Sequence, residues 1–191
     1  MSKKFILDSS ELSQWHTLVQ EAEQDYGCHL DEAMQSYLVF TLMRFAKNSQ
    51  LNSKALALDY LTSHHLSSHL RNEQLRDIGD QCLLVSGLFP QSAEKRLVGA
   101  GYYVDLGRSA YHHISTAAQQ GIAELYQQLA ESFVLLMDLL QTIRQYSAPA
   151  LQPIAAMELW SRTGSRAAFL QIAEHASPVH GCLLGDVNKD N

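Results

Sequence analysis

The strongest repeating pattern in the chain is an apolar repeat with helical spacing between residues 122 and 146. Its apolar side chains recur every three or four residues, at Ile122, Leu125, Leu129, Phe133, Leu136, Leu140 and Ile143. This spacing places them on one face of an α-helix. With a rise of about 1.5 Å per residue, the predicted helix is ~36 Å long, which is the full height of a small helical bundle.

The remaining sequence reads as further helices separated by short polar breaks. Helices are predicted over residues 10–26, 31–46, 53–65, 72–89, 92–98, 102–119, 153–160 and 166–176. Those at 31–46, 72–89 and 122–146 have apolar surfaces wider than one stripe, so we expect them to form the buried centre. No stretch alternates as a β-strand does, and the expected fold class is all-α, a single-domain bundle of about seven to nine helices without a sheet. The bundle is expected over 1–176 and a polar C-terminal tail over 177–191.

Composition and charge exclude several classes of protein. The net charge is −6 and basic residues are not clustered, so general nucleic-acid binding is disfavoured. Three widely spaced cysteines, Cys28, Cys82 and Cys182, predict reduced thiols in the cytosol. The most apolar window, residues 133–140, contains Asp138 and is far too short to cross a bilayer. With no signal-peptide core at the start, we expect a cytoplasmic protein without a membrane partner.

Common catalytic and nucleotide-binding motifs are absent from the sequence. There is no GxxxxGK[ST] phosphate loop, GxGxxG, HExxH, GxSxG or EF-hand spacing. There is also no Glu-x-x-His pair, which argues against a ferritin-like di-iron centre. The cofactor, if one is used, is therefore unknown from the sequence, and the most recognisable helical enzymes are excluded.

A polar surface is predicted on the helix that begins at Tyr102. At about 100° per residue, Asp105, Arg108 and His112 fall within about 60° of one another. A carboxylate, a guanidinium and an imidazole on one face can bind a small anionic ligand or perform acid–base chemistry. They also fit an ion pair beside a surface histidine. His113 falls on the opposite side and is expected to be half-buried and hydrogen-bonded.

The preceding helix, at 72–89, is expected to pack against this one. Gly79 and Gly107 have no side chains that would hold the two helices apart. We therefore expect Arg108 to point toward carboxylates of the earlier helix, with Asp80 as the best candidate. The candidate ligand-binding residues are Asp80, Tyr102, Tyr103, Asp105, Arg108 and His112.

A second possible site is a stripe of metal-binding residue types. His65, His69, Glu73 and Asp77 are spaced by four, so on an unbroken helix they would present nitrogen and oxygen ligands to a divalent metal. The serines at 67–68 instead suggest a break, with His65 near the end of one helix. The metal candidates are His65, His69 and Glu73.

A glycine-containing turn separates the last two predicted helices. A helix-turn-helix motif would use such a turn, and Arg162 and Arg166 could then reach phosphates. However, Glu158 is the only charged residue of the helix at 154–160, and the whole protein is acidic. An αα-hairpin packed on the bundle is therefore the favoured interpretation.

Two segments in the middle of the chain carry a likeness to known sequences. Residues 101–111 read GYYVDLGRSAY, and residues 82–90 read CLLVSGLFP. Over residues 82–111 the chain resembles uncharacterised helical proteins of bacteria. The resemblance implies a bacterial cytoplasmic origin and assigns no activity.

Two classes of function remain open. Only 18% of the residues are charged, and large aromatic residues such as Trp15 and Trp160 are at risk of exposure. Both features favour a non-catalytic helical protein that associates with itself or another protein. The alternative is a helical small-ligand-binding protein or a metal-dependent hydrolase that uses the region from Tyr102 to His113.

Overall fold

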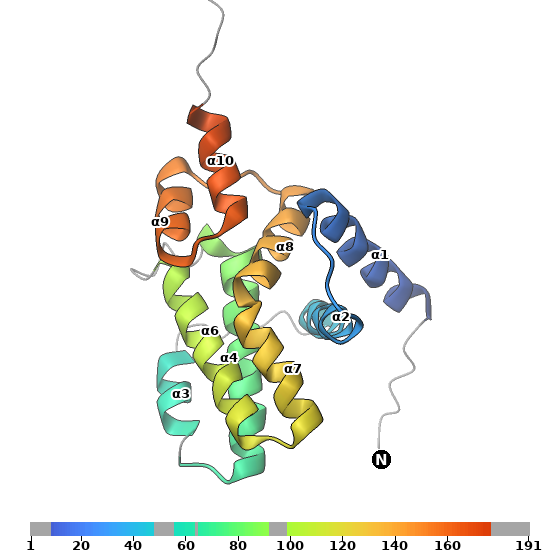
Figure 1. Cartoon of the computed structure of the whole chain (residues 1–191), viewed down its shortest axis with the longest axis vertical. Coiled ribbons are helices and arrows are strands. Elements are labelled where there is room, and N and C mark those ends of the chain that lie inside the picture. Colours follow the sequence, from blue (N-terminus) through green and yellow to red (C-terminus); the bar gives the residue numbers. More distant parts are fainter. Residues whose placement is uncertain (1–8, 48–55, 64, 92–98, 177–191) are drawn as a thin grey trace, which may run out of the picture.

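Helices make up nearly all of the chain that the structure describes. The computed structural model describes residues 9–47, 56–63, 65–91 and 99–176, which form nine helices and no strand (Figure 1). The helices are α1 (Ser9–Tyr26), α2 (Glu32–Lys47), α3 (Leu56–Ser63), α4 (Ser68–Leu88), α6 (Ala100–Ala117), α7 (Gln120–Glu131), α8 (Phe133–Gln145), α9 (Pro153–Thr163) and α10 (Arg166–Ala176). The predicted all-α class is confirmed for these residues. The helix expected at 92–98 and the tail at 177–191 lie outside them.

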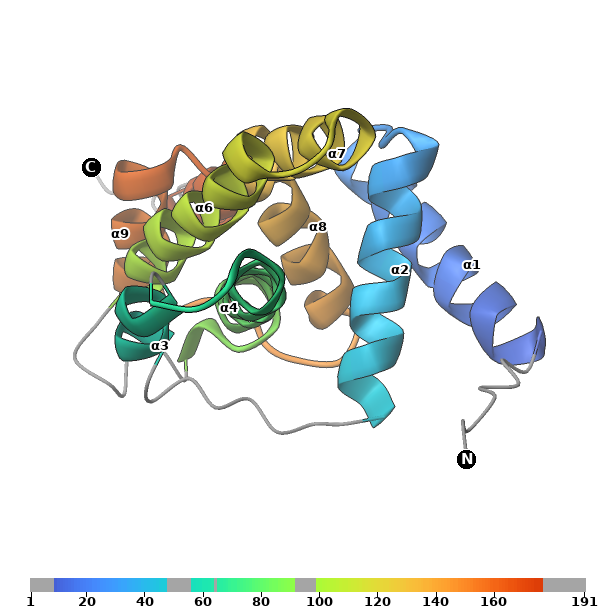
Figure 2. The same cartoon turned by 90° about the horizontal axis from the view of Figure 1, so that it is seen from below.

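The central helix of the bundle is α4. It packs most extensively against α6 and next against α8, and Figure 2 shows it end-on among its neighbours. Glycines permit this close approach: a Cβ on Gly79 would overlap the Tyr111 ring, and one on Gly107 would lie 2.5 Å from Cζ of Phe133. The predicted packing of these two helices through their glycines is confirmed.

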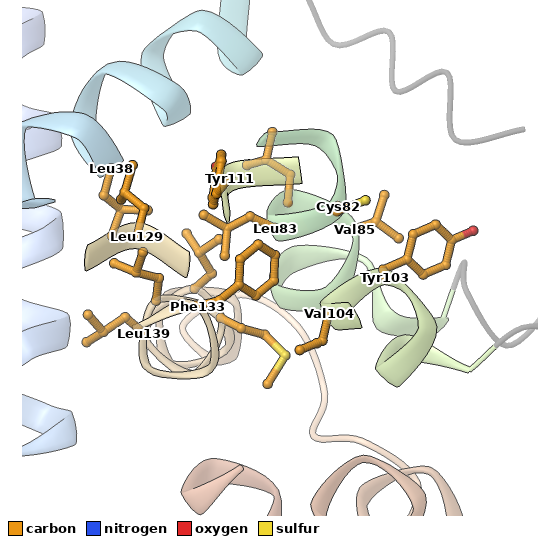
Figure 3. Packing of buried hydrophobic residues seen from close by; sticks show 14 of the residues in the cluster. Leu38, Cys82, Leu83, Val85, Tyr103, Val104, Tyr111, Leu129, Phe133 and Leu139 are labelled. Atoms are coloured by element: carbon orange, nitrogen blue, oxygen red, sulfur yellow. The ribbon is translucent and has the colours of Figure 1, made fainter. Parts of the chain in front are cut away.

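The buried centre differs in part from the sequence prediction. As predicted, α4 and α8 are central, and Leu83 and Leu136 are buried. The helix that the prediction omitted is α6: its buried Tyr111 ring contacts Phe133 of α8, and its buried Tyr103 lies beside Val85 of α4 (Figure 3). The predicted contribution of α2 also holds, since its Leu38, Val39, Leu42 and Met43 are buried, but this helix is not buried all round, because Phe40 is 51% exposed. Tyrosines and small residues build the buried face of α6, so no aliphatic repeat marks it in the sequence.

The single long helix predicted at 122–146 is wrong. The chain bends at Ser132, where φ is −90° and ψ is 10°, and α7 and α8 follow each other across this residue. The hydrogen bonds from Ser132 N–H to the Gln128 carbonyl and from Leu136 N–H to the Ser132 carbonyl both persist. Because the backbone bonds continue past the bend, the apolar repeat continues too and hides the break.

Several helix ends lie where the sequence places them. Gly27 ends α1 with a φ of 73°, as the sequence predicts. By contrast α9 continues three residues past its predicted end at Trp160 and stops before Gly164, whose φ of 72° is also a left-handed conformation that favours glycine. Asp31 caps α2 by accepting the Met34 N–H at 2.8 Å. Pro153 occupies the first turn of α9, where its missing N–H costs no hydrogen bond.

Two expectations around α3 and α4 need correction. The core side of α3 is expected at Leu56, Tyr60 and Leu61; Leu56 is buried, but Leu61 is 63% exposed. The next helix begins at Ser68, four residues before the predicted Asn72. An N-cap with extended backbone at Ser67 starts it there.

Candidate functional site

An apolar surface lies on the outside of the hairpin formed by α9 and α10. Ile154 is 84% exposed, Met157 57%, Trp160 43% and Phe169 47%. The first three recur at intervals of three residues along α9, and the Trp160 and Phe169 rings are in contact, with centroids 5.5 Å apart. We call these four residues the α9–α10 face. Exposed apolar side chains that gather on one surface mark candidate interaction sites.

The inner side of α9 explains why these residues face outward. Ala156 and Leu159 point into the bundle and are almost completely buried. They occupy the side of the helix that contacts the core, and α9 also packs against α6. Because Ala156 and Leu159 occupy the core-facing side of α9, the apolar residues at 154, 157 and 160 face away from the bundle.

A buried carboxylate on α8 fixes the hairpin to the bundle. Asp138, 1% exposed, accepts hydrogen bonds from Ser165 Oγ at 2.6 Å, from Tyr26 Oη at 2.8 Å and from the Ala167 N–H at 3.2 Å. Burial raises the pKa of the Asp138 carboxyl, and these three donors oppose that shift. One side chain thus joins α1, α8 and the first turn of α10, which holds the apolar face in a fixed position.

The charged residues of the hairpin balance one another and contact the bundle. The two negative charges of Glu158 and Glu174 equal in number the two positive charges of Arg162 and Arg166. Arg162 Nη2 lies 3.0 Å from Asp105 Oδ2 in an ion pair, and Arg166 Nη1 donates to the backbone carbonyl of residue 26 at 3.2 Å. The predicted αα-hairpin is confirmed, and both arginines bind the protein's own helices.

The polar residues predicted on one face of α6 do share a groove. Asp105, Arg108 and His112 line an open depression of ≈ 360 Å³ between α6 and α7, opposite Gln127 and Glu131. Asp105 forms an ion pair with Arg162 of α9. The lining of the groove itself contains the carboxylates of Asp105 and Glu131 and the guanidinium of Arg108. This mixture of charges does not favour an anionic ligand.

Asp80 lies in a different place from that groove. It is 2% exposed and accepts hydrogen bonds at 2.6 Å from Tyr37 Oη and from Tyr111 Oη. Arg44 of α2 forms an ion pair with Asp80 and also contacts Asp77 at 3.1 Å. Burial raises the pKa of the Asp80 carboxyl, while the Arg44 guanidinium and the tyrosine hydroxyls oppose that shift. The network joins α2, α4 and α6 inside the bundle.

The expected pairing of Arg108 with Asp80 is therefore wrong. Arg108 Nε donates to the Ala130 carbonyl of α7 at 3.2 Å, on the exposed side of α6. The core-facing side of α6 is taken by its tyrosines and Gly107, and the next residue is turned by about 100°. Tyr103 is buried, and its ring packs against Tyr102 with centroids 5.4 Å apart. Neither tyrosine lines the α6–α7 groove.

The histidine predictions find little support in the geometry. His65 precedes α4 in a turn, so it does not continue the stripe of His69 and Glu73, which are both exposed with Nδ1 and Oε2 3.7 Å apart. In the part of the chain that the structure describes, no group of three or more possible ligands could hold a metal. His113 is hydrogen-bonded as expected, to Tyr60 Oη at 2.9 Å, but it is exposed and not half-buried.

Sequence reasoning missed the role of Asp138 and, apart from Trp160, the outward face of α9. A lone carboxylate in the most apolar window of a chain persists there when several donors satisfy it, and this signal was available. The apolar residues at 154, 157 and 160 can also be read in the sequence. However, a short helix with two apolar faces has the same sequence pattern as a fully buried helix. Only the packing of the inner face distinguishes them.

Comparison with known proteins adds no relative to this description. No family model, no curated protein and no solved structure matches the chain. Within the described residues, no helix combines the length and the apolar character needed to span a membrane. The chain's own surfaces are therefore the guide to its function.

Proposed function

We propose that this protein acts without catalysis, by self-association through the α9–α10 face. The observation that carries the proposal is the exposed ring pair of Trp160 and Phe169 beside Ile154 and Met157. Aromatic residues and methionine are enriched in protein interfaces, and tryptophan is common among the residues that dominate binding energy.

A second copy of the chain is the partner that the charges favour. The net charge of −6 opposes self-association in general, but the hairpin carries two acidic and two basic residues. Two hairpins can therefore approach without net repulsion. The centre of the face, around Met157 and Trp160, lies on a helix surface that packs well against another helix.

The shape of the surface also supports helix-on-helix packing. The α6–α7 groove and the pocket beside α10 are lined by residues other than the four of the face. A helical or extended peptide partner needs a groove to enter. Two α9–α10 hairpins related by a twofold axis would instead form a four-helix contact with the same residues on both sides.

Sedimentation velocity on matched variants tests this proposal. We expect the wild-type mass to rise with concentration between about 1 and 100 μM, the range in which weak interfaces dissociate. Met157→Glu introduces a charge into the face and should keep the protein monomeric. Ile122→Glu is the control, because Ile122 on α7 is 53% exposed and lies outside the face; it should associate like the wild type.

Two results would contradict the proposal. A monomeric wild type at all these concentrations would exclude self-association. The second is dissociation of the assembly by Leu61→Glu on α3, a residue 63% exposed, while Met157→Glu leaves it intact; that result would place the interface on α3. Unchanged far-ultraviolet circular dichroism confirms that each variant is folded.

A further inference from the structure

A pocket of ≈ 490 Å³ lies where the ends of α1 and α8 meet α10. Figure 1 shows these two helix ends beside α10. Three alanines and Leu170 give the pocket an apolar wall, and Asp25, Tyr146, Arg166 and Glu174 supply polar groups. Both its volume and its mixed lining are typical of sites for small organic molecules. None of the four residues of the α9–α10 face contributes to it.

The charges around this pocket favour a cation. Asp25 and Glu174 place two carboxylates on its walls, against the single guanidinium of Arg166. That guanidinium is already engaged, because it donates to the Tyr26 carbonyl and lies 5.2 Å from the centre of the Tyr26 ring. The C-terminal ends of α1 and α8 add the negative ends of two helix dipoles. The walls therefore carry one more negative than positive charge, which favours a positively charged ligand.

An aromatic ring is held in place beside the carboxylates. Tyr146 donates its hydroxyl to Asp25 Oδ2 at 2.6 Å, and its side chain remains 48% exposed. Burial and the hydrogen bond to Asp25 raise the pKa of Tyr146 to about 12, so the ring stays neutral. The hydroxyl end of the ring meets Asp25, so an ammonium group bound to this carboxylate would lie near an aromatic ring, whose quadrupole attracts cations. Leu170 of α10 also lines the pocket and offers apolar contact to the body of a ligand.

We infer that this pocket binds a small organic cation, a protonated alkyl or arylalkyl amine. Its ammonium group would lie between Asp25 and Glu174 beside the Tyr146 ring. The apolar body would pack against Leu170 and the alanines. This inference is independent of self-association, since it uses a different surface of α10.

A titration followed by amide NMR tests the inference with two probes of opposite charge. Phenethylamine should shift the amide signals of Asp25, Tyr146 and Leu170 in a saturable way, with a Kd of about 1 mM or tighter. The anion 3-phenylpropionate carries the same ring and should produce no saturable shift at these residues. The double variant Asp25→Asn and Glu174→Gln should weaken amine binding about tenfold or more, because it removes both carboxylates. Glu124→Gln on α7, outside the pocket, should leave the affinity unchanged.

Three results would overturn the inference. One is binding of 3-phenylpropionate as tightly as the amine, which would assign the pocket to anions. Another is an affinity for the amine that the double variant does not reduce. The third is the absence of saturable shifts at the pocket with both probes. Dispersed amide spectra of the variants would show in each case that the bundle is folded.

Discussion

The buried carboxylate of Asp80 is satisfied by one cation and two tyrosine hydroxyls. Replacing Arg44 by methionine keeps much of the apolar stem and removes the guanidinium, which leaves the carboxylate with neutral donors only. We expect the free energy of unfolding to fall by about 2–3 kcal/mol, the cost of a buried charge that loses its partner. Urea denaturation monitored by circular dichroism measures this change.

An exposed ion pair provides the matched control for that substitution. Arg162 and Asp105 are 45% and 66% exposed and lie 3.0 Å apart. Arg162→Met should cost only about 0–1 kcal/mol, because water screens exposed pairs. Equal losses of unfolding free energy in both variants would mean that Arg44 stabilises the buried Asp80 carboxylate no more than an exposed ion pair would.

The carboxyl of Asp138 makes stability depend on pH in a direction that can be checked. Burial raises its pKa from the ordinary value of 3.8, so the folded state binds the proton more tightly than the unfolded chain. The stabilisation from this group is thus complete below the unfolded pKa and is lost as the pH rises through the folded pKa. The titratable and charged residues that face the Asp138 carboxyl are Tyr26 of α1 and Arg166 at the start of α10.

Asp138→Asn removes this titration while keeping a side-chain acceptor. We expect the unfolding free energy of the wild type, relative to the variant, to fall as the pH rises from about 4 and then to level off. Urea denaturation of both proteins at a series of pH values provides the comparison. A difference that grows with pH would show that the donors Ser165, Tyr26 and Ala167 outweigh burial.

At the scale of helices, two glycines should respond in opposite ways to the same substitution. A Cβ on Gly107 of α6 would lie 2.5 Å from Phe133 Cζ and 2.9 Å from Cys82 Cβ, so Gly107→Ala forces α6 away from the core. The expected loss is about 1–3 kcal/mol, as in other overpacked cores. Gly121 in α7 has nothing within 4 Å of such a Cβ, and Gly121→Ala should stabilise by about 0.5–1 kcal/mol. Thermal or urea denaturation separates the two; a neutral Gly107→Ala would show that the helices can move apart freely.

The elements of this fold were largely predictable because local signals define them. The left-handed glycine at Gly27 and the cap at Asp31 place helix ends from sequence alone. The bend at Ser132 was not predictable, since the hydrogen bonds and the apolar repeat pass through it. The partners of a buried carboxylate were not predictable either, because Arg44, which forms the ion pair with Asp80, lies 36 residues earlier in the sequence.

The candidate site was predictable only in part for the same reason. Asp105, Arg108 and His112 share a groove because their relation depends on the geometry of a single helix. The α9–α10 face depends on which side of α9 contacts the bundle, and that choice is made by tertiary packing. Long-range contacts therefore decide the features that matter most for function.

At the scale of the whole molecule, the acidic excess and the proposed contact lie near opposite ends of the sequence. Residues 1–35 carry seven acidic residues against two lysines, whereas the hairpin at the other end of the chain is balanced. Because the proposed contact is apolar, salt should weaken the self-association little; it should instead screen the repulsion between the acidic regions of two copies.

The fluorescence of Trp160 tests the central claim most directly. The chain has two tryptophans, so Trp15→Phe leaves Trp160 as the only reporter, and it lies in the proposed interface with 43% of its surface exposed. We predict that its emission maximum moves to shorter wavelength as concentration rises, along the same curve as the mass from sedimentation. A mass that increases while the Trp160 emission stays constant, or a protein that remains monomeric throughout, would contradict the account.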